Sequence, residues 1–479
     1  MNISERHLTL LCDFYELTMA RGYFNSEMKN KVAYFDVFFR KVPDGGGYAI
    51  ACGLEQIIEY IKSIKFTKDD IEYLRGKKIF DEDFLEYLST FSFTGDIWAV
   101  PEGTVIFPGE PIMTVRANAM EAQFIETFIL LIFNHQCLVA TKASRIVRAA
   151  QGRPVSEFGS RRAHGPDAAI YGARAAYIGG CASTACTVAD IMFGVPAGGT
   201  MAHSWVQMFD DEYTAFCEYC RLYPKNPTLL VDTYNVLKSG VPNAIKAFKE
   251  MLTEEERKHC AVRLDSGDIT YLTKKVRKML DAAGLTECRI IVSNSLDEYI
   301  IRDILMQGAQ VDGFGVGERM ITSKSEPVFG CVYKLCAVED EGRVVPRIKI
   351  SENAAKITNP DFKKLYRFYS KETGKAEADL ITIYDEVIDP TQPYELFDPD
   401  HVWKRKLMVD YELRELLVPI FENGKCVYTS PSVSEIRENC KKELLSMWDE
   451  VLRFENPHNY YVDLSQKLWD EKNQLLKKR

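Results

Sequence analysis

The chain has 479 residues, enough for two or three domains that each bury a hydrophobic core. Its hydrophobic content of 46% and charged content of 27% are those of an ordinary globular protein. The formal net charge of -9 argues against a nucleic-acid-binding protein, whereas a small anionic ligand needs only a local cationic pocket. An odd number of cysteines, 13, fits a reduced cytoplasmic protein better than a disulfide framework.

Residues 1–135 are expected to form an N-terminal domain of mixed α/β type. LTLLCDFYELTMARGYF, residues 8–24, places Leu11, Phe14 and Tyr15 near helical spacing and predicts an amphipathic helix. KVAYFDVFFRKVPDGGGYAI, residues 31–50, predicts a strand followed by a glycine-rich turn. GDIWAVPEGTVIFPGEPIMTVRA, residues 95–117, predicts a compact antiparallel piece with turns at Pro-Glu-Gly and Pro-Gly-Glu.

A long helical pattern follows from Ala119 to about Ala150. Its most apolar run, Phe128 to Phe133, is far shorter than the roughly 20 residues that a membrane span needs. The pattern therefore predicts a core helix and no association with a membrane.

The sequence pattern is different in residues 136–350. Here short β-prone runs alternate with helical patterns such as VPNAIKAFKEML and ITYLTKKVRKML. Each run ends at polar residues or glycines, and the runs are PVSEFGSRR, GGTMAHSW, TLLVDTYN, CAVRLDSGD, RIIVSNSLD and VDGFGVGER. Such alternation is typical of a parallel sheet. Because no dinucleotide-binding fingerprint accompanies it, we expect an α/β barrel rather than an open Rossmann sheet. Residues 351–479 are mixed in type and are expected to pack on the N-terminal domain.

In an α/β barrel the chemistry lies at the carboxyl ends of the strands. The predicted strand ends carry cations, carboxylates, hydroxyls and bare glycines, a set that suits a sugar phosphate. They supply Ser160, Arg161, Arg162, His164, Thr200, His203, Asp232, Thr233, Arg263, Asp265, Ser266, Asp268, Ser293, Asn294, Gly313, Gly315 and Gly317.

The glycines of DGFGVGER let backbone N–H groups approach an oxyanion, although an ordinary tight turn is an equally good explanation. Asp265 and Asp268, which flank Ser266-Gly267, are candidates to hold Mg²⁺ or to bind ribose hydroxyls. Asp268 is also placed to cap a following helix.

The adjacent arginines Arg161 and Arg162 are forks suited to phosphate or carboxylate. Because adjacent side chains do not easily point the same way, a surface salt bridge is the alternative for one of them. For His203 the alternatives are a satisfied core histidine, or a general base, phosphate donor or nucleophile at a strand end.

Eight motifs in this order resemble the nicotinate phosphoribosyltransferase family over about residues 8–370: DFYELTM, SEFGSRRAHG, GGTMAHSWV, LLVDTYN, VRLDSGD, VSNSLDE, GFGVGERMIT and EPVFGCVYKL. The resemblance implies a type II phosphoribosyltransferase, an irregular α/β barrel with an additional mixed α/β sandwich domain. It further implies a homodimer with shared active sites. The family joins nicotinate to phosphoribosyl pyrophosphate in NAD biosynthesis, with Mg²⁺ and with ATP hydrolysis coupled through a phosphohistidine.

Carried over by motif, the resemblance assigns the phosphate-carrying role to His203 and places Tyr15 on the pyridine ring, from the partner subunit. It associates Thr200 and Arg263 with nicotinate, with Arg161 near the ligand. Thr322 matches a position on the phosphoribosyl side, and the site also includes Asp265, Asp268, Ser293, Asn294, Gly315 and Gly317. One departure concerns Gly317, which is followed here by Glu318, a residue that would repel a phosphate.

Three alternatives remain open at this point. Nicotinamide phosphoribosyltransferase would gain nothing from a cation such as Arg263, which favours the acid unless it only neutralises Asp265. Quinolinate phosphoribosyltransferase has no need of a phosphohistidine, and a catalytically silent relative would bind nucleotide only. Cys217 and Cys220 have metal-type spacing, but a single such pair is better explained by buried helical thiols than by zinc.

Overall fold

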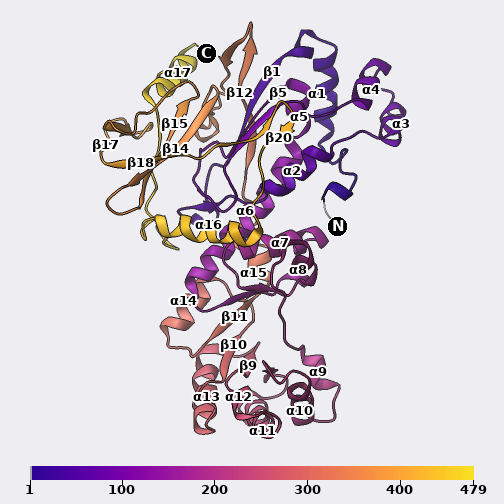
Figure 1. The fold of residues 1–479 in the computed structure, drawn as a ribbon, viewed down its shortest axis with the longest axis vertical. Helices are drawn as coiled ribbons and strands as arrows, with labels where there is room; N and C mark the ends of the chain where they lie inside the picture. Colours follow the sequence, from indigo (N-terminus) through magenta and orange to yellow (C-terminus); the bar gives the residue numbers. More distant parts are fainter. Residues whose placement is uncertain (1–2, 479) are drawn as a thin grey trace. The chain divides into compact units, whose positions relative to one another are not determined.

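The computed structural model describes residues 3–478 (Figure 1). The chain divides into two compact units, Met1–Leu138 with Val328–Arg479, and Val139–Pro327. The sequence places the barrel in residues 136–350, so the second unit is shorter at its carboxyl end than that range. The difference arises because β12 (Val332–Asp340) and β13 (Arg343–Pro346) belong to a sheet of the first unit, where β12 pairs with β1 (Val32–Phe38).

The first unit is built on mainly antiparallel sheets to which both ends of the chain contribute, with one parallel pairing, between β15 and β21. In the described residues its largest sheet has the strand order β13-β12-β1-β5-β3-β19-β20, and a second sheet has the order β18-β14-β15-β21. Pairing of β19 with β3 brings the late part of the chain into the sheet formed by residues 31–118. The remaining strands are β2 Ala49–Ile50, β3 Asp96–Ala99, β4 Val105–Ile106, β5 Met113–Asn118, β14 Lys363–Ser370, β15 Ala376–Ile383, β16 Tyr394–Phe397, β17 Arg405–Met408, β18 Tyr411–Glu415, β19 Val418–Glu422, β20 Lys425–Cys426 and β21 Val462–Leu464.

The predicted antiparallel piece at residues 95–117 is confirmed, because β3 and β5 pair antiparallel. The first helix is shorter than predicted: α1 is Phe14–Phe24, and Leu11 lies outside it. Asp13 occupies the N-cap position with extended backbone angles, so the helix begins only at Phe14. The other helices of this unit are α2 Leu54–Ser63, α3 Lys68–Gly76, α4 Glu82–Ser89, α5 Ala119–Phe124, α6 Glu126–Ala149, whose last turns belong to the second unit, α16 Val433–Ser446 and α17 Gln466–Lys477.

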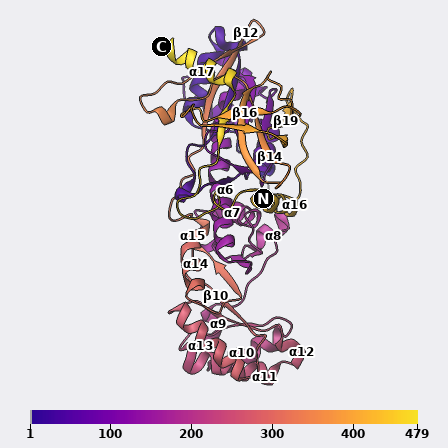
Figure 2. The same ribbon diagram turned by 90° about the vertical axis from the view of Figure 1, so that its left-hand side faces the viewer.

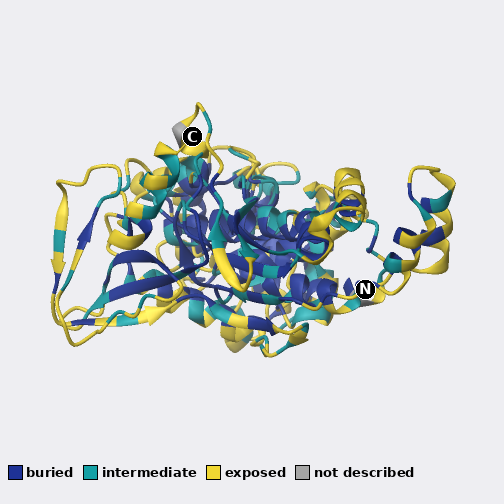
Figure 3. Cartoon of the chain, turned by 90° about the horizontal axis from the view of Figure 1, so that it is seen from above, coloured by how far each residue is buried: buried dark blue, intermediate teal, exposed yellow. Residues whose placement is uncertain are grey.

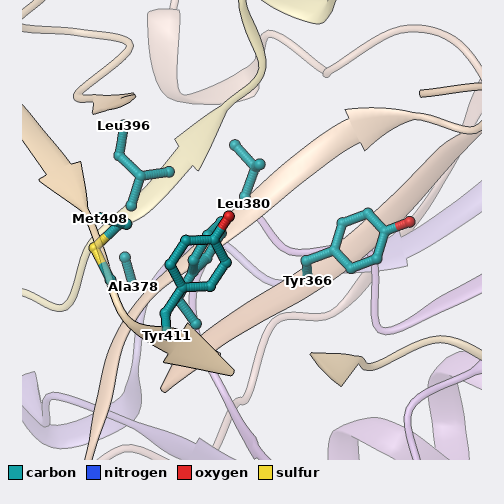
Figure 4. Packing of buried hydrophobic residues seen from close by; sticks show 7 residues of the cluster. Tyr366, Ala378, Leu380, Leu396, Met408 and Tyr411 are labelled. Atoms are coloured by element: carbon teal, nitrogen blue, oxygen red, sulfur yellow. The ribbon is translucent and has the colours of Figure 1, made fainter. Parts of the chain in front are cut away.

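Many residues of these strands are aromatic or aliphatic and buried. Figure 3 colours the buried residues of the chain dark blue. One cluster joins Tyr366, Phe368, Leu380, Met408 and Tyr411 from β14, β15, β17 and β18 (Figure 4). The apolar stretch Ala119–Ala149 is long enough to cross a membrane by composition, but 72% of its most apolar window is buried inside the protein. The predicted core helix is therefore buried as expected, but it is divided at Ile125 into α5 and α6.

The second unit contains the parallel sheet predicted from the alternating pattern. Within the described chain its order is β7-β6-β11-β10-β9-β8, and every pairing is parallel, as an irregular α/β barrel requires. Helices α10, α11 and α13 lie close together beside it (Figures 1 and 2). The elements are β6 Val155–Glu157, α7 Pro166–Ile178, β7 Ser183–Thr184, α8 Thr187–Phe193, α9 His203–Gln207, α10 Glu212–Leu222, β8 Thr228–Leu230, α11 Val241–Met251, α12 Glu254–Arg257, β9 Ala261–Leu264, α13 Ile269–Ala282, β10 Arg289–Val292, α14 Glu298–Met306, β11 Gly313–Val316 and α15 Glu318–Ile321.

Five of the six predicted strands are confirmed, and GGTMAHSW is wrong as a strand. Its glycines contribute no side chain to pack, and His203 is the first residue of α9. The sheet position is taken instead by β7, beside which Ala197 forms a single parallel bridge to Thr184. That bridge and a hydrogen bond from Gly198 N to Thr184 O (2.8 Å) still hold the run along the sheet edge.

Candidate active site

His203 and Asp232 form a hydrogen-bonded pair beyond the strand ends of the second unit. His203 Nε2 lies 3.1 Å from Asp232 Oδ1, and the two side chains are 40% and 1% exposed. Asp232 follows β8, and His203 reaches it from the start of α9. The exposure of the imidazole rules out the alternative of a core histidine. The buried Asp232 carboxylate contacts Nε2 and so orients the imidazole ring. The second ring nitrogen, Nδ1, takes no part in this contact.

Neighbouring loops hold the Asp232 carboxylate in place. Its Oδ2 accepts hydrogen bonds from the Asp265 backbone N (2.9 Å) and the Ser266 hydroxyl (2.7 Å). The Ser293 hydroxyl in turn donates to Asp265 Oδ1. The ends of β8, β9 and β10 are therefore connected through side chains, as the sequence pattern predicts.

Arg263 lies on β9 and donates from Nη1 to the Thr200 hydroxyl. Burial lowers the pKa of its guanidinium, while the charges of Asp265 and Asp232 oppose that change and the charge of Arg161 adds to it. Within the described chain no ion pair joins Arg263 to Asp265, whose carboxylate is held by Ser293 instead. The guanidinium is therefore not committed to balancing Asp265.

Four buried polar atoms that follow or end strands of this sheet have no hydrogen-bond partner among the described residues: Arg263 Nε, Thr233 Oγ1, Ser160 Oγ and Arg319 Nε. Buried donors and hydroxyls are nearly always satisfied in native proteins. Unmatched atoms that gather at strand ends indicate a place where a polar ligand binds.

The loops after β10 and β11 are joined to each other. Arg319 Nη1 donates to Asp297 Oδ2, and the Ser295 hydroxyl lies 3.4 Å from Glu318 Oε1. Lys324 Nζ donates to Glu318 Oε1 at 3.2 Å and lowers the pKa of that carboxyl. Glu318, which at first sight would repel a phosphate, is thus held by a cation.

Backbone strain occurs in the same region. Asn294 has a φ of 112°, a value that residues other than glycine rarely adopt, and such strain clusters at functional sites. Gly315 and Gly317 have a packing reason to be glycine. A Cβ on Gly315 would lie 2.4 Å from the Phe158 ring, and one on Gly317 would lie 2.9 Å from the Phe158 carbonyl oxygen. Their part in phosphate binding stays a prediction.

The remaining predicted residues of the second unit lie as follows. Arg161 and Arg162 are both exposed, on the short 3₁₀ turn Ser160–Arg162. Asp268 caps α13 through a 2.7 Å hydrogen bond from Tyr271 N, as anticipated, and Thr322 Oγ1 donates to the Glu318 carbonyl at 2.6 Å.

Tyr15 belongs to the first unit, where it lies on α1 with 43% of its surface exposed. Burial of its hydroxyl and the nearby Glu126 raise the pKa of Tyr15. Its predicted contact with the pyridine ring stays a prediction.

Among residues 3–478 no group of three or more His, Cys, Asp or Glu side chains is arranged to hold a metal ion. Mg²⁺ commonly uses one or two carboxylates together with substrate phosphates, so Asp265 and Asp268 fit that mode rather than a closed cage. Burial raises the pKa of Cys220 to about 12, which keeps its thiol neutral.

The sequence pattern places Asp232 and Ser266 at the strand ends but indicates no role for either. The pattern LLVD, in which a carboxylate directly follows a buried strand, was the available signal for Asp232.

The comparisons with known proteins agree in one direction. The family models for the nicotinate phosphoribosyltransferase N-terminal domain and C-terminal domain match residues 10–134 and 362–472. Nicotinate phosphoribosyltransferase of Bacillus subtilis is 43% identical over 469 residues, covering 98% of this chain and 95% of the relative. Nicotinate phosphoribosyltransferase pncB2 of Mycobacterium tuberculosis is 38% identical over 473 residues, covering 98% and 94%. The crystal structure of human nicotinic acid phosphoribosyltransferase matches with a TM-score of 0.83 at 27% identity, covering 98% of this chain and 100% of that one.

Proposed function

The chain belongs to the nicotinate phosphoribosyltransferase family, and we propose that it joins nicotinate to phosphoribosyl pyrophosphate, with ATP hydrolysis coupled through a phosphorylated His203. The products are nicotinate mononucleotide and pyrophosphate, and the reaction is a cytoplasmic step of NAD salvage. The observation that carries the proposal is the pair of His203 with the buried Asp232, beside an arginine with an unmatched buried donor.

The pair supports phosphate transfer to histidine. With Nε2 directed at Asp232, Nδ1 is the nitrogen that attacks the γ-phosphorus of ATP, and ADP leaves as the P–O bond breaks. The positive charge on the phosphorylated ring is stabilised by the Asp232 carboxylate. Water later cleaves the N–P bond, which returns His203 and releases inorganic phosphate.

The glycosyl transfer needs positioning rather than a general base. The pyridine nitrogen of nicotinate is already nucleophilic and attacks C1 of the ribose as the bond to pyrophosphate breaks. Arg263 binds the nicotinate carboxylate, and Thr200 orients the guanidinium through the hydrogen bond that joins them. Arg161, Ser293, Asn294, Gly315, Gly317 and Thr322 contribute to binding of the phosphoribosyl group.

Asp265 and Asp268 are the residues that would hold Mg²⁺, which neutralises charge on the departing pyrophosphate. The functional unit is a homodimer in which Tyr15 of one subunit stacks on the pyridine ring bound by the other. The exposure of Tyr15 on α1 supports this, since a buried tyrosine has no surface to offer a partner.

Mass spectrometry after incubation with Mg-ATP tests the coupling. Wild-type protein should carry one acid-labile, base-stable phosphate on His203, and His203→Ala should carry none and should lose ATP hydrolysis. Phosphate on another residue, or hydrolysis by His203→Ala at the wild-type rate, would reject the phosphohistidine.

A further inference from the structure

The first unit contains a cavity of about 210 Å³ at the end of β1. Three segments line this half-open pocket: the end of β1 with Arg40, the turn between β4 and β5, and residues 355–363. The side chains of Phe38, Pro108, Pro111 and Ile357 give it apolar walls. Small-molecule sites are mostly apolar cavities with few polar groups.

The buried charges in the floor of this cavity neutralise each other. Lys363 Nζ lies 2.8 Å from Asp36 Oδ2 and donates to the Pro360 carbonyl at 3.0 Å. Thr114 Oγ1 donates to Asp36 Oδ1 at 2.8 Å. The floor therefore needs no ligand charge.

Arg40 and Asn359, at the rim of the pocket, have hydrogen-bond donors that no acceptor of the described chain satisfies. Arg40 Nε donates to the Ala355 carbonyl at 3.1 Å, and in the described chain its two terminal nitrogens make no hydrogen bond. Asn359 accepts from Lys472 Nζ through Oδ1 (2.8 Å), which leaves its amide NH₂ as a donor. A partner that suits both groups carries only acceptors, as a carboxylate does.

The electrostatic environment also favours an anion. Burial lowers the pKa of Lys334, and the positive charges of Lys349 and Arg40 lower it further. Glu126 is the carboxylate that opposes them, 4.0 Å from Lys334 Nζ. Of these cations Arg40 lines the pocket, and a negative charge bound to Arg40 would reduce its repulsion with Lys334.

We propose that this pocket binds a small planar monocarboxylate, with its ring against the apolar walls and its carboxylate on Arg40 and Asn359. A dry cavity of about 150 Å³ accommodates benzene, so 210 Å³ has room for a ring and one carboxylate. Nicotinate belongs to this class. That this chain meets nicotinate rests on the proposed function, whereas the chemistry of the pocket does not.

Calorimetric titration of the full-length chain with benzoate tests the proposal. Benzoate has no ring nitrogen and cannot accept a ribosyl group, so binding is read independently of activity. Titrations use Arg263→Gln protein, which removes the carboxylate site proposed for catalysis. One benzoate per chain should bind. Arg40→Gln should weaken benzoate binding at least about tenfold, because a charge-assisted hydrogen bond is lost. Lys356→Gln removes an exposed cation of residues 355–363 and should leave benzoate binding unchanged.

A second variant, Ile357→Trp, keeps Arg40 but fills the cavity, and should also abolish binding; circular dichroism establishes that each variant is folded. Benzamide should bind much more weakly than benzoate. The proposal is overturned if Arg263→Gln alone abolishes binding, if folded Arg40→Gln or Ile357→Trp binds like its parent, or if benzamide or inorganic phosphate binds as well as benzoate.

Discussion

Replacing Arg263 by glutamine removes the charge of the proposed nicotinate-binding guanidinium but keeps a side chain able to bond Thr200. In the structure Arg263 is largely buried, donates to Thr200 and has a buried Nε without a partner among the described residues. The two nearby carboxylates form no ion pair with Arg263 in the described chain, because each is hydrogen-bonded elsewhere. Asp265 bonds Ser293, and Asp232 bonds His203, Ser266 and the Asp265 backbone N. The available donor is therefore free for a ligand carboxylate.

The size of the effect follows from one charge-assisted hydrogen bond, which contributes roughly 1.5–3 kcal/mol. At about 1.4 kcal/mol per decade, Arg263→Gln should raise KM for nicotinate by about 10- to 150-fold. KM for phosphoribosyl pyrophosphate should stay nearly unchanged, and the preference for nicotinate over nicotinamide should narrow. Arg162→Gln, an exposed arginine on the 3₁₀ turn Ser160–Arg162, serves as the control.

Steady-state kinetics with each substrate varied in turn measures these constants. If both KM values rise equally, Arg263 balances Asp265 or supports the phosphoribosyl site and does not read the nicotinate carboxylate. A wild-type preference for nicotinamide would equally refute the reasoning.

Four further predictions concern the His203–Asp232 pair, the packing of Gly315, the pH dependence of stability and the dimer. Asp232→Asn should slow histidine phosphorylation by about 10- to 100-fold in rapid-quench experiments, and Ser266→Ala should slow it less. An unchanged rate of histidine phosphorylation in Asp232→Asn would show that Asp232 has no part in the mechanism. Gly315→Ala should lower the free energy of unfolding by about 1–3 kcal/mol because its Cβ meets Phe158, whereas Gly199→Ala, with open space around it, should change it by no more than about 0.5 kcal/mol. Burial raises the pKa of Glu16 to about 8 from 4.5, so its contribution to stability is complete below about pH 4.5 and is lost as pH rises through 8. Glu16→Gln should therefore gain stability over wild type as pH rises through that window, and parallel pH profiles of the two melting temperatures would contradict it. Mixed dimers of Tyr15→Ala and His203→Ala chains should recover part of the transfer activity, and proven heterodimers without activity would place both residues in one subunit's site.

Much of the second unit could be predicted because its signals are local. Each parallel strand is a short apolar run ending in a polar group, and parallel pairing brings these ends to one edge of the sheet. Asp265, Ser293 and Arg263 were found in this way. His203 was found for a partly wrong reason: its run is not a strand, but a bridge beside β7 holds it near the strand ends.

Long-range pairing could not be predicted from the pattern. β12 looks like a further strand of the barrel, yet it pairs with β1, some 300 residues earlier in the chain. The carboxylate–hydroxyl contacts of Asp232 with Ser266 and of Asp265 with Ser293 likewise depend on which strands become neighbours. The reason for glycine at position 315 also became visible only once Phe158 was seen to pack against it.

The central claim is tested most directly by identifying the product formed from phosphoribosyl pyrophosphate and each of nicotinate, nicotinamide and quinolinate, with Mg-ATP, by liquid chromatography and mass spectrometry. The wild-type chain should convert nicotinate to nicotinate mononucleotide with one pyrophosphate released per product and should react with the other two bases far more slowly. Preferred conversion of nicotinamide or quinolinate, or no mononucleotide from any base by a folded protein, would contradict the account.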